Sequence, residues 1–176
     1  KNIIRITADC PLIDPKILDQ MISLFIKKKV DYLSNNNPPT FPDGFDIEIF
    51  TFKSLALANR KASSSFDREH VTNYIRNSNL FKKYNFKYSK DYSFLRLTLD
   101  ENRDHELLSK IINVFGSNIY FSLEEIIDLY NKNKKIFEIN KHIRRNEGSI
   151  MNKGQKFWKR ANNIIPGGTM LFSKNP

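Results

Sequence analysis

The chain has 176 residues, of which 40% are hydrophobic, 12% aromatic and 27% charged, a balance that excludes a disordered, collagen-like or coiled-coil protein. Its single cysteine, Cys10, excludes an internal disulfide and a cysteine-based zinc site. The longest apolar runs fall far short of the roughly 20 residues that cross a bilayer, and no signal-peptide pattern opens the chain, so we expect a cytoplasmic protein without a membrane span.

The formal net charge of +10 is concentrated towards the end of the chain. Residues 1–130 hold 18 basic and 17 acidic side chains, whereas residues 131–176 hold 11 and 2. Because the basic stretch lacks the interleaved aromatic residues and the motifs of nucleic-acid binders, a solvated connecting segment explains it better, and we expect no nucleic-acid partner. A tail that binds nucleic acid or an anionic membrane surface is the alternative. The pattern predicts a domain over 1–130 and a basic linker over 131–153.

The first elements are predicted from apolar patterns and helix caps. Residues 2–8 form a near-continuous apolar run that is typical of a strand buried in a parallel sheet. Asp14 followed by Pro15 predicts a helix start, and apolar residues at helical spacing continue to Phe25. Asp9 therefore lies where a strand ends and a helix follows.

The next stretch predicts two strands joined by a loop and then two helices. Residues 30–34 and 45–50 have strand patterns, and the Asn/Pro/Gly-rich residues 35–44 between them predict a loop. One helix is predicted after Thr51 and another from Asp67.

The remaining elements predict an α/β fold with a mixed sheet covered by helices. Residues 81–88 and 94–99 are predicted strands, and in the second strand the polar side chains alternate with leucines and form a candidate site face. Residues 104–115 predict an amphipathic helix, and Ser122 with Glu125 predicts a capping box for a helix through Tyr130.

Four strings, in this order, resemble the cytidylyltransferases related to spore-coat polysaccharide synthesis proteins and CMP-sugar-acid synthetases. They are RITADCPLID at 5–14, FPDGFDIE at 41–48, DREHVT at 67–72 and RLTLD at 96–100. The resemblance covers about residues 1–148 and implies a three-layer, Rossmann-like nucleotide-diphospho-sugar transferase fold. It also implies an enzyme that activates an acidic sugar with CTP for bacterial surface polysaccharide synthesis, uses Mg²⁺, releases pyrophosphate and forms a homodimer.

The family's N-terminal strand and phosphate-cradling loop have no counterpart in this sequence. We therefore expect an N-terminally truncated domain from a longer protein, inactive as this chain alone. A non-catalytic binding or scaffolding module, fused to an aminotransferase, is the alternative.

A second, shorter resemblance follows the basic stretch. GQKFWKRA at 154–161 and IPGG at 165–168 are similar to the opening of glutamate-1-semialdehyde aminomutase-like aminotransferases. The resemblance implies that residues 154–176 begin an aminotransferase domain, and pyridoxal phosphate (PLP) would belong only to that downstream domain. A capping helix that ends at a Pro-Gly-Gly turn is the alternative.

Asp9 and Asp100 are the candidate metal ligands and catalytic residues. Each ends a predicted strand, and ligands in open α/β sheets bind outside the carboxyl ends of the strands. Nucleotidyl transfer needs the phosphate charges neutralised, usually by Mg²⁺ held on carboxylates. With the family resemblance we expect metal ligation; from the spacing alone, both residues would read as helix or turn caps.

Basic residues supply further candidates. Arg68 (catalytic) and His70 (substrate-binding) flank Glu69 at the start of a predicted helix, where the helix dipole favours an anion; a surface ion pair explains them equally well. Arg5 and Arg96 lie on predicted central strands, so each should meet a carboxylate or a substrate anion. We expect Arg5 to pair within the protein and Arg96 to contact substrate.

Two acidic residues beside the Asn/Pro loop complete the candidates. Asp46 and Glu48 could accept hydrogen bonds from sugar hydroxyls, although a solvated loop and an exposed strand face explain them almost as well.

Overall fold

The computed structural model describes residues 1–145. The chain divides into two units, Lys1–His142 and Ile143–Pro176, and the following account concerns the first. The expected aminotransferase-like segment, 154–176, lies outside the described residues. Among the helices of the described part, none has the length and apolarity that a membrane crossing requires.

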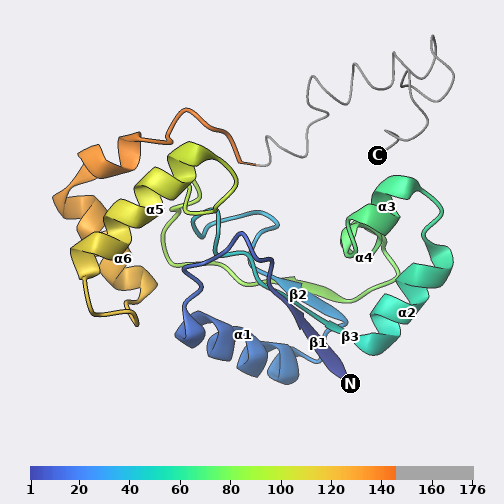
Figure 1. The fold of residues 1–176 in the computed structure, drawn as a ribbon. Helices are drawn as coiled ribbons and strands as arrows, with labels where there is room; N and C mark the ends of the chain where they lie inside the picture. Colours follow the sequence, from blue (N-terminus) through green and yellow to red (C-terminus); the bar gives the residue numbers. More distant parts are fainter. Residues whose placement is uncertain (146–176) are drawn as a thin grey trace, which may run out of the picture. The chain divides into compact units, whose positions relative to one another are not determined.

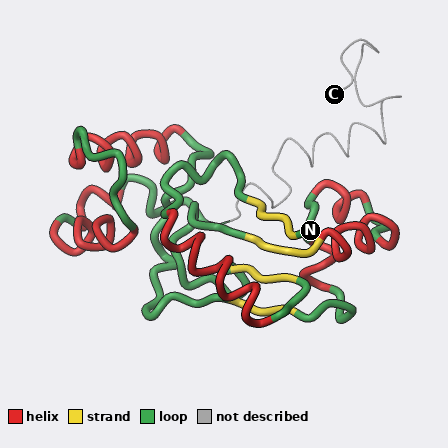
Figure 2. The backbone as a smooth tube through the Cα atoms, turned by 90° about the horizontal axis from the view of Figure 1, so that it is seen from below, coloured by secondary structure: helices red, strands yellow, loops and turns green. Residues whose placement is uncertain are grey.

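A four-stranded mixed sheet forms the centre of the first unit, as expected. The strands are β1 (Asn2–Arg5), β2 (Tyr32–Ser34), β3 (Glu48–Thr51) and β4 (Lys83–Asn85), in the spatial order β1-β3-β2-β4. Strand β3 runs antiparallel to both neighbours, whereas β2 and β4 are parallel. Figure 2 shows the strands side by side, with α1 crossing in front of them.

Among residues 1–145, seven helical segments lie around this sheet (Figure 1). They are α1 (Pro15–Lys28), α2 (Phe52–Lys61), α3 (Ser65–Glu69), α4 (Asn73–Asn77), α5 (Asn102–Phe115), α6 (Leu123–Lys132) and the 3₁₀-helix η1 (Lys134–Glu138).

Side-chain alternation along β2 and β3 separates two cores. Leu33 and Ile49 belong to the larger core, which includes residues of α1, α5 and α6. Tyr32 and Phe50 belong to a smaller core with residues of α2 and α4. Since successive side chains of a strand point to opposite faces, helices cover both faces of the sheet, and the expected layered α/β arrangement is confirmed.

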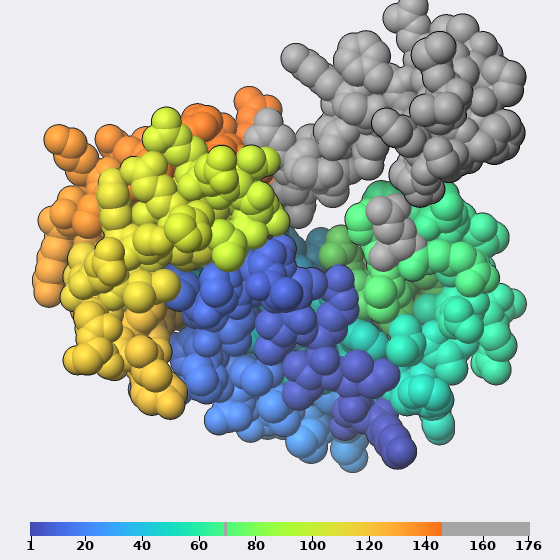
Figure 3. All heavy atoms as spheres, in the orientation of Figure 1, coloured from blue at the N-terminus to red at the C-terminus, as the bar shows by residue number. Residues whose placement is uncertain are grey.

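Strand β1 corrects the expectation of a strand buried in a parallel sheet. Within the described residues it pairs with β3 alone, in antiparallel register, and so forms one edge of the sheet. Ile4 is 43% exposed and Ile6, just beyond the strand, is 40% exposed. The atoms of this N-terminal segment, in dark blue, reach the surface in Figure 3. An apolar run does not by itself reveal which neighbours a strand has.

The predicted helix starts with strong local caps are confirmed. Asp14 caps α1, Thr51 caps α2, and Ser122 and Glu125 form the capping box of α6. Helix α5 begins at Asn102, two residues before the predicted start, because Glu101 and Asp104 form a capping box of their own.

The helix predicted to start at Asp67 is instead two short helices. Ser64 caps α3 by accepting a hydrogen bond from the backbone N–H of Asp67, so the helix starts earlier and already ends at Glu69. His70 is its C-cap, and α4 starts three residues later. The Asp67 carboxylate accepts from the Asn73 side chain and joins the two helices.

Residues 94–99 do not form the strand that their alternation predicts. Their link to the neighbouring loop is a single bridge, Asp43 to Arg96, without a ladder. The backbone N–H of Leu97 donates to the carbonyl of Asp43 at 2.7 Å. Gly44 (φ +95°) makes this approach possible, since a Cβ there would lie 2.5 Å from backbone atoms of Leu97 and Thr98.

The domain boundary expected at residue 130 is too early. Phe137 in η1 is buried in the main core, and Asn140 is only 1% exposed. These contacts extend the body to His142, so the start of the predicted basic linker is part of the domain.

Candidate functional site

Asp9 and Asp100 converge on the hydroxyl of Thr98. The Thr98 Oγ1 lies 3.4 Å from Asp9 Oδ2 and 3.5 Å from Asp100 Oδ2, so the two carboxylates are no farther apart than the sum of these distances. The same hydroxyl donates to the backbone carbonyl of Asp9 at 3.1 Å. That carbonyl also accepts a hydrogen bond from the backbone N–H of Leu99 at 2.9 Å. These contacts place the turn after β1 against residues 98–100. The two aspartates lie close together, but neither ends a strand as the sequence predicts, because β1 ends at Arg5 and residues 94–99 form no strand.

The environment of this pair fits a hard cation in part. Carboxylate oxygens are the ligands that Mg²⁺ prefers, and Mg²⁺ in nucleotide enzymes is commonly held by one or two carboxylates together with substrate phosphates and water. The Asp100 side chain is 49% exposed, so it is open to such ligands. Within residues 1–145 there is no group of three or more His, Cys, Asp or Glu side chains arranged for a metal. The two aspartates would therefore supply only part of the coordination shell of such an ion.

Arg96 organises the acidic side of the site. Its guanidinium donates to Asp104 through Nε at 2.9 Å and Nη2 at 2.8 Å, and it also reaches Asp100 at 3.0 Å and Asp43 at 3.2 Å. Arg96 is 8% exposed and Asp104 is fully buried. The guanidinium that we expected to bind substrate thus already contacts three carboxylates, and it fixes the orientation of Asp100.

The carboxylate of Asp104 accepts more hydrogen bonds than any other carboxylate described in this region. Besides Arg96, it accepts hydrogen bonds from the backbone N–H groups of Asp100 and Glu101 and from the side chain of Asn140. Burial alone would raise the pKa of Asp104, but the hydrogen bonds from Arg96 and Asn140 outweigh burial and hold the pKa below its usual range. Burial likewise opposes the charge of Arg96, and the bonds and charge of Asp104 more than offset it, so the pKa of Arg96 is raised.

Cys10 lies in the same turn as a buried thiol. Its Sγ is 3.4 Å from Thr7 Oγ1 and 3.8 Å from Asp9 Oδ1. Burial, with the negative charges of Asp9 and Asp46 adding to it, raises the pKa of Cys10 to about 11. A buried thiol with a raised pKa fits a small packing residue rather than a nucleophile. The charge of Asp46 acts on Cys10, so half-buried Asp46 lies beside the Asp9 turn.

Glu48 is buried, which rules out the exposed strand face considered from the sequence. Its carboxylate accepts from Arg5 at 2.6 Å, from Thr72 at 2.8 Å and from the hydroxyl of Tyr32, and Arg76 lies 4.0 Å away. The expected pairing of Arg5 within the protein is confirmed. Burial and the Glu48 charge raise the pKa of Tyr32, so its hydroxyl stays protonated and donating.

Arg68 and His70 lie at the end of α3 and not at a helix start, so the helix dipole does not favour an anion there. Arg68 is exposed, and the His70 ring packs against Phe66. Over residues 1–145, no hydrogen bond or ion pair joins either residue to Asp9 or Asp100.

Several residues of this site are missing from the predicted set. The sequence indicates a polar face on residues 94–99 without singling out Thr98, and it gives no site role to Asp43, Asp104 or Asn140. The spacing of four between Asp100 and Asp104 could have drawn attention to Asp104, because it is typical of side chains on adjacent helical turns. Asn140 has no local signal, since its role depends on contacts with residues about forty positions earlier in the chain.

A family sequence profile covers most of the chain: the profile described as Cytidylyltransferase matches residues 1–143. The chain belongs to the cytidylyltransferase family. Two curated proteins are similar to it. The uncharacterized protein MJ1063 of Methanocaldococcus jannaschii is 36% identical over 146 residues, which cover 81% of this chain and 58% of the relative. The spore coat polysaccharide biosynthesis protein SpsF of Bacillus subtilis is 32% identical over 135 residues, which cover 74% and 55%.

A solved cytidylyltransferase structure from Leptospira borgpetersenii serovar Hardjo-bovis is also similar, with a TM-score of 0.74 and 38% sequence identity. The match covers 77% of this chain and 58% of that one. It confirms the nucleotide-diphospho-sugar transferase-like fold that the sequence predicts. The chain spans little more than half the length of the relatives it matches.

Proposed function

We propose that this cytidylyltransferase chain contributes the metal-binding aspartates of an enzyme that couples CTP to an acidic sugar and releases pyrophosphate. The observation that carries the proposal is the convergence of Asp9 and Asp100 on Thr98. The membership of the family supports the reaction class. The name of the relative SpsF supports a product used in a surface polysaccharide.

In this reaction a sugar hydroxyl oxygen attacks the α-phosphorus of CTP, the bond from that phosphorus to the pyrophosphate oxygen breaks, and the hydroxyl proton passes to solvent water. A bound Mg²⁺ supplies charge neutralisation for the phosphates and the leaving pyrophosphate. Asp9 and Asp100 would hold the ion. Arg96 acts as a positioning residue, because it holds Asp100 through Oδ2 and leaves the other carboxylate oxygen, Oδ1, for ligands.

The remaining candidates divide by their surroundings. Asp46, half-buried near Cys10, is proposed to accept a hydrogen bond from a sugar hydroxyl. Glu48 already has its own partners, so it positions the strands rather than substrate. Direct roles for Arg68 and His70 remain predictions, as do a homodimer and a PLP-dependent domain downstream.

The test separates metal binding from turnover. Mn²⁺ binding to the 176-residue chain is followed by electron paramagnetic resonance. Turnover is measured as CTP-dependent pyrophosphate release with acidic sugars, on the whole protein that the gene encodes. Asp9→Asn should lower turnover by orders of magnitude and weaken Mn²⁺ binding at least tenfold, because it removes charge with almost no change in volume. Asp100→Asn should act in the same direction, less severely.

Asp128→Asn is the matched control, since Asp128 is an exposed aspartate of α6. It should leave both readouts unchanged. Circular dichroism checks that each variant is folded. Wild-type Mn²⁺ affinity and wild-type turnover at limiting Mg²⁺ in both site variants would show that the two aspartates are only turn and helix caps.

A further inference from the structure

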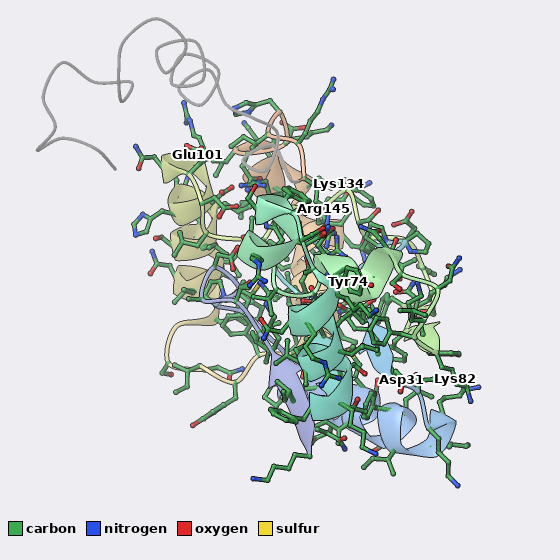
Figure 4. All side chains as sticks on the ribbon, turned by 90° about the vertical axis from the view of Figure 1, so that its right-hand side faces the viewer. Asp31, Tyr74, Lys82, Glu101, Lys134 and Arg145 are labelled. Atoms are coloured by element: carbon green, nitrogen blue, oxygen red, sulfur yellow. The ribbon has the colours of Figure 1, made fainter. Side chains whose placement is uncertain are left out.

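A cavity of about 290 Å³ opens between the segment at residues 94–96, the end of α6, and η1 with the turn that follows it. We call it the Phe94 cavity, after the most exposed of its aromatic residues. Lys134, which lines it at the start of η1, is labelled in Figure 4. The volume is close to the lower end of the roughly 300–1,000 Å³ of small-molecule pockets, so the cavity has room for one small molecule.

Three aromatic rings form much of the apolar part of the lining. The ring centres of Phe94 and Tyr130 are 5.7 Å apart, and those of Tyr130 and Phe137 are 5.3 Å apart with their planes at 89°. Phe137 is buried in the main core, whereas Phe94 remains 59% exposed. Aromatic rings favour offset-stacked or edge-to-face neighbours at such separations. The exposed ring of Phe94 therefore offers a contact to one further flat ring.

Asn140 supplies a hydrogen-bond acceptor to the cavity. Both of its amide hydrogens are used, since Nδ2 donates to the Arg96 carbonyl at 3.0 Å and to Asp104 at 2.8 Å. Among residues 1–145, no donor reaches the Oδ1 of Asn140, although this residue is only 1% exposed and lines the cavity. Because buried polar atoms normally have a hydrogen-bond partner, this oxygen is available to a donor on a ligand.

The charged residues of the lining favour an anion. They include two lysines, Lys134 and Lys141, and one glutamate, Glu138. Within the described part of the chain, none of the three forms an ion pair. The Lys134 ammonium lies 5.8 Å from the centre of the Tyr130 ring, so this charge is held beside the aromatic lining. Arg96 adds no free charge, since it already pairs with three carboxylates.

We propose that the Phe94 cavity binds a small aromatic acid, that is, a flat ring system that carries an N–H donor and a carboxylate. The ring packs against Phe94 and Tyr130, the N–H donates to the Oδ1 of Asn140, and the carboxylate pairs with Lys134. Each requirement comes from a different part of the lining, so ring, donor and charge are needed together. The proposal depends neither on metal binding by Asp9 and Asp100 nor on turnover.

The test is calorimetric titration of the 176-residue chain with indole-3-acetate, which has all three features. Three related probes each lack one of them: 1-methylindole-3-acetate has no N–H donor, 3-methylindole has no carboxylate, and acetate has no ring. Indole-3-acetate should bind, and each related probe should bind about tenfold more weakly or worse, because it loses one contact.

Two variants connect the binding to the cavity. Phe94→Ala and Lys134→Gln should each weaken the binding of indole-3-acetate about tenfold. The matched controls are Phe52→Ala, since Phe52 is 57% exposed at the start of α2, and Lys135→Gln, since Lys135 is the exposed neighbour of Lys134. Neither control residue lines the cavity, so both controls should bind like the wild-type chain. If Phe94→Ala fails to fold by circular dichroism, Lys134→Gln still decides, because the Lys134 side chain is exposed.

Three results would overturn the proposal. They are no binding of indole-3-acetate, equally tight binding of any related probe, and an equal loss of binding in a control and its site variant. Because the titration uses neither a metal nor CTP, its failure would leave the proposed function untouched. Mn²⁺ binding in Asp9→Asn tests that function separately.

Discussion

The Arg96 guanidinium and the Asp104 carboxylate form a two-point ion pair, with N–O distances of 2.8 and 2.9 Å, inside the domain. Both side chains are buried, and the pair connects the extended segment at residues 94–99 to the first turn of α5. Because removing one partner leaves a buried charge without compensation, this pair is the most sensitive point of the site.

Asp104→Ala should lower the free energy of unfolding by about 3–5 kcal/mol, the range for breaking a buried pair on one side. Urea unfolding followed by circular dichroism measures it. The control is Glu106→Ala, whose ion pairs with Arg103 and Lys110 are exposed on the same helix. A loss from Asp104→Ala no larger than that from Glu106→Ala would contradict a central role for the pair.

The stability contributed by Asp104 should disappear in acid. Its pKa is lower in the folded chain than in the unfolded chain, so the unfolded chain binds a proton first as the pH falls. The contribution is complete above the unfolded pKa of about 3.9 and is lost as the pH falls through the folded value. The difference in unfolding free energy between wild type and Asp104→Asn should therefore be constant at neutral pH and narrow only as the pH falls below about 4–5, the region of the unfolded pKa. A difference that stays constant down to pH 2 would argue against it.

Gly44→Ala should disrupt the site far more than Gly116→Ala. Both glycines have a positive φ, but a Cβ on Gly44 would lie 2.5 Å from the backbone of Leu97 and Thr98, whereas a Cβ on Gly116 would meet no atom within 4 Å. Gly116→Ala should therefore cost only the conformational penalty, about 1–2 kcal/mol. Chemical unfolding of both variants, with Mn²⁺ binding as the second readout, compares them. Similar losses in the two would show that the loop can move away from residues 97–98.

Asp14→Ala should loosen two helices together. One carboxylate oxygen accepts from the backbone N–H of Lys16 in α1 at 2.8 Å, and the other from that of Leu123 in α6 at 3.0 Å. Losing a cap and leaving a buried N–H without a partner should cost about 2–4 kcal/mol in total. Hydrogen exchange of the Leu123 amide should be faster in Asp14→Ala than in the wild-type chain. Unchanged exchange at Leu123 would mean that α6 does not depend on this link.

Cys10 should resist alkylation at neutral pH. Burial and the nearby negative charges raise its pKa to about 11, so the reactive thiolate is scarce until the pH approaches that value. The rate of iodoacetamide modification in the folded chain should rise steeply between pH 8 and 11. Asp9→Asn should shift this rise to lower pH by removing one negative charge. Equal rates for folded and urea-unfolded chains at pH 8 would contradict the burial.

The parts predictable from sequence are those with local causes. The caps of α1, α2 and α6 are formed by residues within a few positions of the helix start, and the apolar spacing of α1 and α5 describes the face that each buries. The motifs around Asp9 and Asp100 identified the family, and the structure brings these two residues to one hydroxyl.

The errors concern pairings that no local pattern contains. Residues 94–99 alternate like a strand, yet Arg96 turns to Asp104 and Asp43, and the backbone pairs with loops at residues 9 and 43 instead of a ladder. The apolar run of β1 says nothing about β3 being its neighbour. Helix α3 starts at Ser65, capped by Ser64, and not at Asp67, because two competing caps lie three residues apart.

Asn140 donates hydrogen bonds to the carbonyl of Arg96 and to Asp104, so the acidic cluster cannot complete its folding before residue 140 has been synthesised. During synthesis the acidic cluster and its arginine leave the ribosome well before residue 140 does. Until that residue arrives, the Arg96 carbonyl and one Asp104 oxygen lack their final donor, and Phe137 has not yet covered the core behind them. A nascent chain that stops at residue 130 would contain Asp9 and Asp100, the two proposed metal ligands, but not the Asn140 side chain that completes the hydrogen bonding of Asp104.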